Sequence, residues 1–173
     1  SFTPSTSVTP SFVAGAEINE LAVQTPVQGK EPAAAGQRLF DRIETLGKPV
    51  IAAINGLALA GGSELMMACD VIFASTDFRI GDQHAQYGLV PGWGGSQRLP
   101  RIVGAAKALE MVTSGTHVGG AESLAMGLFD QLVPEGELLA GAKQFARQVV
   151  AEGRPLRKVR DANDKLLPDR GNT

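Results

Sequence analysis

The chain has 173 residues, of which 43% are hydrophobic and 20% charged, so we expect one domain with a single sizeable core. The formal net charge is -2 and the basic residues are scattered, which argues against nucleic acid or a membrane surface as partner and favours a small molecule. The single cysteine, Cys69, cannot form an internal disulfide, so a buried thiol and a reducing, cytoplasmic location are predicted.

The N-terminal segment carries no targeting signal that composition can identify. Residues 1–10 are rich in Ser, Thr and Pro and lack both a basic start and an apolar core, so we interpret them as a disordered arm or the remnant of a truncation. Further along, Asn55 and several glycines interrupt the longest apolar stretch before it reaches the roughly 18 residues of a membrane span. No membrane association is therefore expected.

The next segments predict an α/β pattern. Residues 24–36 hold two prolines and two glycines, so a mobile loop is predicted between Leu21 and Gln37. Residues 37–46 repeat apolar side chains at helical spacing and predict a helix that ends before Gly47. The runs PVIAAIN (49–55) and DVIFAS (70–75) predict buried strands with one short helix between them, an order typical of α/β proteins.

The C-terminal half predicts helices separated by turns. Residues 86–101 are rich in turn-forming residues, and the segments 105–115, 121–127 and 137–153 each show a helical face that ends at a glycine. The last twenty residues, 154–173, are charged and predict no packed element. Glycines number 21 and gather at 56–62 and 88–95, which indicates a site between two loops where the backbone turns sharply or approaches a ligand.

The sequence GGSE at residues 61–64 predicts chemistry at a helix start. The first N–H groups of a helix have no partner within it, and glycine leaves room for a carbonyl group to approach them, as an oxyanion hole requires. Glu64 follows within one turn, so its carboxylate is a candidate acid or base whose pKa apolar neighbours such as Leu59 and Met66 would raise. An alternative is that the glycines only form a tight turn and Glu64 satisfies the helix start.

Four segments resemble, in order and spacing, the enoyl-CoA hydratase/isomerase family, whose members are also called crotonases. They are FVAGAEINEL (12–21), KPVIAAINGLALAGGSELMMACD (48–70), YGLVPGWGGSQRLPRIVG (87–104) and AMGLFDQLVP (125–134). The resemblance implies a crotonase-like α/β fold of stacked strand-strand-helix units followed by C-terminal helices, over residues 11–153, with a charged tail at 154–173. It also implies a trimer or a pair of trimers that binds acyl-CoA thioesters without a metal or redox cofactor, coenzyme A being part of the substrate.

The resemblance also implies roles for individual residues. The amides of Ala16 and Gly61 match the two that hold the thioester oxygen, and Glu64 matches the first of the two glutamates that hold water. His84 stands at the position of the second glutamate, and Asp82, two residues before it, could orient the ring. An alternative is that both are polar loop residues that face solvent. Substrate contacts are also expected from six further residues within these segments: Ala14, Leu59, Gly62, Tyr87, Pro91 and Trp93. The other histidine, His117, is expected in a surface loop.

Several functions remain open on the sequence. The first is an enoyl-CoA hydratase in which Glu64 and His84 position water for addition across the 2,3 double bond, with activity falling as the pH drops through the imidazole pKa. An isomerase would use Glu64 alone. An acyl hydrolase would use Ser63 with His84, although neighbouring helical residues point about 100° apart, so Ser63 and Glu64 cannot both face one pocket.

A last possibility is an inactive fragment. Relative to the family, strands before residue 12 and helices after residue 173 are missing, so the domain is expected to be incomplete and to expose sheet edges and apolar surface. The segment RPLRKVRD in the tail resembles the region after the hydratase domain in some bacterial multifunctional fatty-acid oxidation proteins. The chain is therefore also a candidate piece of a longer polypeptide.

Overall fold

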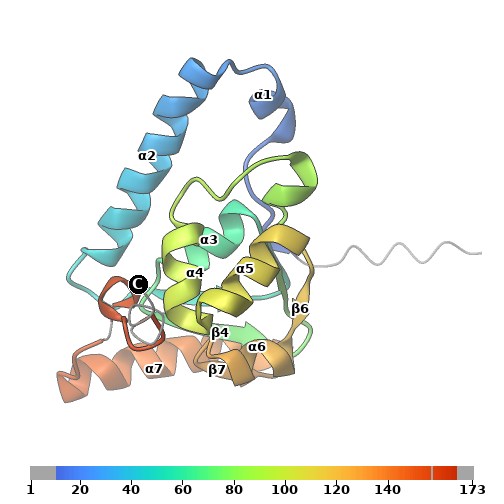
Figure 1. Ribbon diagram of the computed structural model, residues 1–173. Coiled ribbons are helices and arrows are strands. Elements are labelled where there is room, and N and C mark those ends of the chain that lie inside the picture. Colours follow the sequence, from blue (N-terminus) through green and yellow to red (C-terminus); the bar gives the residue numbers. More distant parts are fainter. Residues whose placement is uncertain (1–10, 157, 167–173) are drawn as a thin grey trace, which may run out of the picture.

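The computed structural model describes residues 11–156 and 158–166 (Figure 1). Its strands form a four-stranded and a three-stranded sheet. The first sheet has the order β1 (Ser11–Val13), β3 (Leu57–Leu59), β5 (Arg79–Gly81) and β6 (Val118–Gly119). The second has the order β2 (Ile51–Ile54), β4 (Val71–Ser75) and β7 (Gln131–Val133). All neighbouring strands are parallel except β5 and β6. The arm expected at residues 1–10 lies outside the described residues.

Strands β1 to β5 alternate between the two sheets in chain order, whereas β5 and β6 both lie in the four-stranded sheet. Strands β2 and β3 are followed by helix α3 (Gly61–Met67), and strands β4 and β5 are followed by the 3₁₀ turn η1 (His84–Tyr87) and helix α4 (Gly95–Val103). This succession is the stacked strand-strand-helix arrangement that the resemblance implies, so the predicted fold is confirmed. The predicted C-terminal helices are also present, as α5 (Ala105–Ser114), α6 (Gly120–Met126) and α7 (Leu138–Glu152).

Strand β4 separates two clusters of buried apolar side chains. All five of its residues are buried, as expected for a strand covered on both faces. Its odd positions, Val71 and Phe73, pack with Leu138 and Ala142 of α7, which runs along this sheet in Figure 1. Its even positions face the larger cluster, which contains Met66 and Met67 of α3. No helix within the described residues combines the length and the hydrophobicity needed to cross a bilayer.

The loop predicted between Leu21 and Gln37 is wrong, because the segment forms helices α1 (Ile18–Ala22) and α2 (Pro26–Glu44). Thr25 accepts a hydrogen bond from the Gln28 amide while the Gln28 side chain accepts one from the Thr25 amide, a capping box that fixes the helix start. Pro26 occupies the first turn, where a missing N–H costs nothing, and alanines follow Pro32. The helix predicted over residues 37–46 is the second half of α2.

Helix α2 stands away from the sheets, with its start and α1 at the far end of the molecule from α7 (Figure 1). Its C-terminal half joins the body through two buried side chains, Phe40 and Glu44. The Phe40 ring lies edge-on to Trp93 at a centroid distance of 5.7 Å. This attachment is at one end, so the rest of α2 forms a wall over the space beside α3.

The charged tail does pack, contrary to the prediction. Lys158 forms an ion pair with Asp70, whose side chain is buried. Arg160 bonds Glu44 at 2.9 Å, and Lys165 donates to the Ile102 and Met126 carbonyls. Ion pairs with distant carboxylates hold this segment in place. Because it has few apolar residues, hydrophobic periodicity could not predict that it packs. Residues 157 and 167–173 lie outside the described part.

Candidate active site

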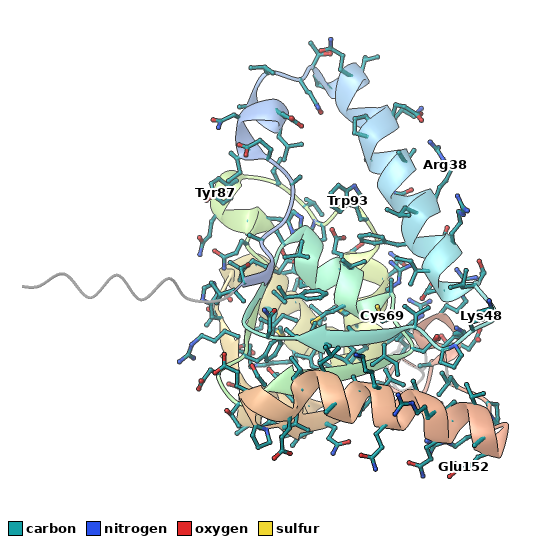
Figure 2. The ribbon with its side chains drawn as sticks, turned by 180° about the vertical axis from the view of Figure 1, so that it is seen from behind. Arg38, Lys48, Cys69, Tyr87, Trp93 and Glu152 are labelled. Atoms are coloured by element: carbon teal, nitrogen blue, oxygen red, sulfur yellow. The ribbon has the colours of Figure 1, made fainter. Side chains whose placement is uncertain are left out.

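A cavity of about 580 Å³ lies between the start of α3, the loop after β1, helices α1 and α2, and η1. Most of the site residues expected from the sequence line it. They are Ala14, Ala16, Leu59, Gly61, Glu64, His84, Tyr87 and Trp93. Figure 2 shows Trp93 below α2 and Tyr87 below α1, so the two aromatic residues stand on different sides of this region.

Two backbone segments meet where the amides of Ala16 and Gly61 lie. Gly15 has φ +112°, and a Cβ added to it would lie 3.1 Å from the Ala60 Cβ and 3.4 Å from the Gly61 nitrogen. The residues around Gly15 are therefore packed directly on the start of α3. Within the described residues, neither the Ala16 nor the Gly61 amide donates a hydrogen bond to a protein acceptor. Both are available to a ligand in the cavity that they line.

Ala60, directly before α3, has an unusual backbone conformation, with φ 48° and ψ -118°. It has the only positive φ among the non-glycine residues that the structure describes. A side chain disfavours this region by about 1 to 3 kcal/mol, and such strain concentrates at functional sites. The conformation turns the chain sharply from β3 into α3 and so sets the direction of the Gly61 N–H.

The structural reason for glycine at positions 61 and 62 differs from the one expected from the sequence. A Cβ at Gly61 would lie 2.5 Å from the Trp93 ring, and a Cβ at Gly62 would lie 1.9 Å from the Val13 carbonyl oxygen. The protein itself, and not a ligand, fills the space that a side chain would need. Gly62 faces β1 and does not line the cavity, and Pro91 lines a second cavity instead, so the structure does not support substrate contacts for either.

The carboxylate of Glu64 is buried, with its side chain 1% exposed, and is held by another helix. Its Oε1 atom accepts hydrogen bonds from the amides of Trp93 at 2.8 Å and Gly95 at 2.7 Å. Gly95 begins α4, which has no side-chain cap of its own, so Glu64 completes the start of α4 and not of its own helix. Burial raises the pKa of Glu64 above 4.5, although the Gly95 and Trp93 amides and His84 oppose the change.

His84 lies between two carboxylates. Its Nε2 atom is 3.8 Å from the Glu64 Oε2 atom, and its Nδ1 atom is 2.6 Å from the Asp82 Oδ1 atom. Burial alone would lower the pKa of His84, but the hydrogen bond to Asp82 and the charges of Asp82 and Glu64 outweigh it, so the pKa is raised above 6.5. The structure thus brings together the Glu64, His84 and Asp82 side chains that the sequence analysis singled out.

Ser63 does not join them. Its Oγ atom donates to the Ala60 carbonyl at 2.6 Å, and the residue is buried and does not line the cavity. His117 is exposed, its ring lies against Gly81 at the end of β5, and it does not line the cavity. No group of three or more His, Cys, Asp or Glu side chains in the described part of the chain is arranged to hold a metal ion.

Sequence reasoning missed the apolar wall that α1 and α2 add to the cavity. The wall consists of Ile18, Leu21, Pro26, Pro32 and Ala33, and it faces Tyr87, Leu89 and Val90 on the other side. The signal that could have found it is the capping box at Thr25, which marks a helix start inside the predicted loop. The amides of Trp93 and Gly95 as partners of Glu64 had no signal, because a backbone donor can come from any residue type.

A second, polar cavity of about 490 Å³ adjoins the first. Gly92 and Trp93 line both cavities, so Trp93 is part of the partition between them. Charged side chains line the second one, namely Asp41, Glu44, Arg98, Arg101 and Arg160. Arg98 is buried and donates to both Glu44 oxygens, at 3.1 and 2.9 Å, and to the Trp93 carbonyl. This ion-pair cluster fixes the loop that carries Trp93 against α2.

Comparison with known proteins gives one consistent result. The family described as "Enoyl-CoA hydratase/isomerase" matches residues 6–168. A short-chain-enoyl-CoA hydratase of Clostridium acetobutylicum is 40% identical over 141 residues, which are 82% of this chain and 54% of that protein. The fatty acid oxidation complex subunit alpha of Shewanella loihica is 44% identical over 161 residues, 91% of this chain and 22% of that protein.

A solved structure agrees. The enoyl-CoA hydratase of Bacillus anthracis superposes with a TM-score of 0.75 at 35% identity, over 79% of this chain and 53% of that one. The chain spans about half the length of the single-function hydratases that it matches. By sequence and by fold, the chain belongs to the enoyl-CoA hydratase/isomerase family.

Proposed function

We propose that this protein adds water across the 2,3 double bond of enoyl-CoA thioesters in fatty-acid β-oxidation. The observation that carries the proposal is that the free amides of Ala16 and Gly61, the Glu64 carboxyl group and the His84 imidazole all line one cavity. The names of the relatives, which include a short-chain-enoyl-CoA hydratase and a crotonyl-CoA hydratase, support the same reaction.

The proposed step uses each group once. His84 Nε2 takes a proton from water while the water oxygen bonds to C3 of the substrate. The electrons of the double bond move onto the thioester oxygen, where the amides of Ala16 and Gly61 stabilise the enolate by about 3 to 4 kcal/mol per well-placed donor. Protonated Glu64 then gives its proton to C2. One water is consumed, and transfer of the proton from His84 to Glu64 restores the starting state.

The residues that line the cavity support a substrate with an apolar acyl chain. The side chains and backbone around Ile18, Leu21, Pro32 and Tyr87 offer an apolar surface for the acyl chain, while polar groups concentrate at the reacting end. Hydration is redox-neutral and the developing charge meets backbone donors, so the proposal calls for no metal and no cofactor apart from the coenzyme A of the substrate.

We further propose the setting that the resemblance implies: a homotrimer or hexamer, or part of a multifunctional chain like the Shewanella subunit. A reducing, cytoplasmic location fits the single thiol. Cys69 is buried, and burial raises the pKa of its thiol to about 11, so it remains protonated and unreactive.

A second candidate is isomerisation, in which Glu64 alone moves a proton between two carbons of the substrate. The burial of Glu64 and its raised pKa suit a carboxyl that gives and takes a proton, and this reaction would leave His84 without a role. Hydrolysis by Ser63 is not favoured, because the Ser63 hydroxyl is bonded to the Ala60 carbonyl away from the cavity.

The test is a spectrophotometric assay with crotonyl-CoA and longer enoyl-CoAs. Hydration removes the absorbance of the conjugated thioester, and Glu64→Gln should abolish the change. A His84→Gln variant separates the two candidates: hydration should be lost, whereas isomerisation of a 3-enoyl-CoA should persist if Glu64 acts alone. Size-exclusion chromatography and a cooperative melt, recorded first, distinguish an inactive fragment from a folded protein of different activity.

A further inference from the structure

We propose that Asp82 is a positioning residue that holds the His84 ring by Nδ1 and presents Nε2 to Glu64, so that Asp82 and His84 together replace a second carboxylate. This inference rests on the proposed hydratase function and extends it to a residue outside the cavity. Asp82 does not line the cavity, so it acts through His84 and not on the substrate.

The ring orientation is fixed from one side. Asp82 Oδ1 lies 2.6 Å from His84 Nδ1 and also accepts the backbone N–H of His84 at 3.2 Å. Because an ionised carboxylate only accepts hydrogen bonds, Nδ1 must carry the proton of a neutral ring. The lone pair then lies on Nε2, which is the atom 3.8 Å from Glu64 Oε2. The ring therefore offers its acceptor nitrogen to the catalytic end of the cavity.

The position of Glu64 is fixed from the other side. Its Oε1 atom is occupied by the amides of Trp93 and Gly95, which leaves Oε2 as the oxygen facing His84. The side chains of Asp82, His84 and Glu64 are 5%, 13% and 1% exposed. Three titratable groups thus lie next to one another with little exposure to solvent, so a charge on one strongly affects the next.

The charged side chains of the helix packed against η1 pair with one another and not with His84, Asp82 or Glu64. Helix α5 packs against η1, but its charged residues Lys107 and Glu110 pair with each other, and Lys107 also pairs with Glu122. Gln83, between Asp82 and His84, is neutral and donates to the Gly115 carbonyl. Asp82 and Glu64 are the charged side chains that face the His84 ring in the described part of the chain. The protonation of His84 is accordingly coupled to these two.

The alignment explains how the site can reset. With Asp82 ionised, His84 and Glu64 share a single proton in the working form. During hydration one proton passes from water to His84 and another from Glu64 to C2, so the pair again holds one proton, now on the ring. Its return from Nε2 to Oε2 restores the starting form without net change. Loss of Asp82 would free the ring to rotate and would weaken its hold on the proton.

A purely structural role for Asp82 must be separated from this one, because its bond to the His84 backbone could serve only to start η1. Asp82→Asn keeps an oxygen that can accept the backbone N–H but removes the charge, whereas Asp82→Ala removes both. Asp130→Asn is the matched control, because Asp130 also accepts a backbone N–H, that of Ile72 at 2.8 Å, and does not line the cavity.

The first experiment reads the ring directly by ¹⁵N NMR of the imidazole nitrogens. The chain has two histidines, so His117→Gln leaves the signals of His84 alone. We expect a proton on Nδ1 and a titration midpoint above 6.5, a lower midpoint in Asp82→Asn, and mixed tautomers in Asp82→Ala. An unchanged tautomer and midpoint in both variants would overturn the inference, whatever the enzyme activity.

The second experiment measures hydration against pH. The working form holds one proton on the Glu64–His84 pair, so activity should fall on both sides of an optimum, with the acidic limb above pH 4.5 and the alkaline limb above pH 6.5. In this scheme the imidazole pKa sets the alkaline limb and not the acidic one expected from the sequence. Asp82→Asn should move the alkaline limb to lower pH and reduce kcat about 100-fold with KM nearly unchanged, and Asp130→Asn should do neither. If the wild type hydrates and Asp82→Asn keeps its profile, positioning fails; if the wild type does not hydrate, only the proposed function fails.

Discussion

Glu64 and Gly95 are 31 residues apart in sequence, yet the Glu64 carboxylate accepts the Gly95 amide at 2.7 Å and so caps helix α4 from helix α3. The same oxygen accepts the Trp93 amide, so one side chain supports both the proposed chemistry and the fold.

This double role predicts that two substitutions at Glu64 differ in stability but not in activity. Glu64→Gln keeps an oxygen for both amides, so its free energy of unfolding should stay within about 1 kcal/mol of the wild type. Glu64→Ala leaves the buried Gly95 donor and the partly buried Trp93 donor without partners, at about 1 to 3 kcal/mol each. Both should lose hydration. Urea denaturation measures the difference, and equal stability of the two variants would refute the capping role.

Glu44 predicts a loss of stability in acid. Burial would raise its pKa, but hydrogen bonds and charges from Arg98 and Arg160 outweigh burial and hold the pKa below 4.5. A lowered pKa in the folded state means that the contribution to stability is fully present above pH 4.5 and is lost as the pH falls through the folded value. Unfolding by urea should therefore become easier below pH 4.5.

Glu44→Gln tests this directly. The substitution leaves the buried Arg98 guanidinium with only the exposed Asp41 carboxylate, 3.6 Å away, as a charged partner, which should cost roughly 3 kcal/mol at pH 7. It should also flatten the dependence on pH below 4.5, because the titrating group is gone. A variant with wild-type stability at pH 7 would show that the pair adds nothing net to folding.

The parts of the fold that sequence predicted are those with a simple burial pattern. Strand β4 is buried at every position and α5 to α7 alternate apolar and polar faces, so composition and periodicity identify them. Strand β3 and helix α4 were not predicted from the sequence, because they are short and lie among glycines, where the local sequence indicates only turns. The first half of helix α2 was not predicted, because its prolines and glycines are typical of a loop and only the capping box at Thr25 indicates a helix start.

The candidate site divides in the same way. Glu64 could be named from its place in the first turn after two glycines, and His84 from the position that the resemblance supplies; the structure places both at one cavity. The cause of the glycines could not be predicted, since Trp93 and the Val13 carbonyl that fill their space are distant in sequence. Pro91 lines the second cavity, in a loop that bends at Trp93 and Gly94, a path that spacing alone does not reveal.

Two glycines of α2 should respond oppositely to alanine. A Cβ at Gly36 would lie 2.3 Å from the Trp93 ring, a rigid group that is itself packed on Gly61 and Phe40. Gly36→Ala should destabilise the protein by about 1 to 3 kcal/mol. A Cβ at Gly29 would meet only the Gln24 side chain at 3.5 Å, so Gly29→Ala should gain about 0.5 to 1 kcal/mol of helix propensity.

Denaturation of the two variants side by side provides the measurement. Each serves as control for the other, since both replace a glycine in the same helix by the same residue. The prediction fails if both changes stabilise, because Trp93 would then not be held against α2. Tryptophan fluorescence adds a local readout: the chain has one Trp, so only Gly36→Ala should shift the emission.

The strained backbone of Ala60 tests whether the geometry of the candidate site lowers the stability of the protein. Ala60 has φ 48°, a value that glycine adopts without penalty, so Ala60→Gly should relieve about 1 to 3 kcal/mol of strain while adding about 0.4 to 1 kcal/mol of unfolded-state entropy. The net expectation is a protein more stable by roughly 1 kcal/mol. Ala68, at the other end of α3 with φ -81°, is the control, and Ala68→Gly should destabilise instead. Thermal unfolding distinguishes the two signs. If Ala60→Gly is destabilised like the control, the turn into α3 stores no strain, and the direction of the Gly61 amide must be set by the packing of Gly15 alone.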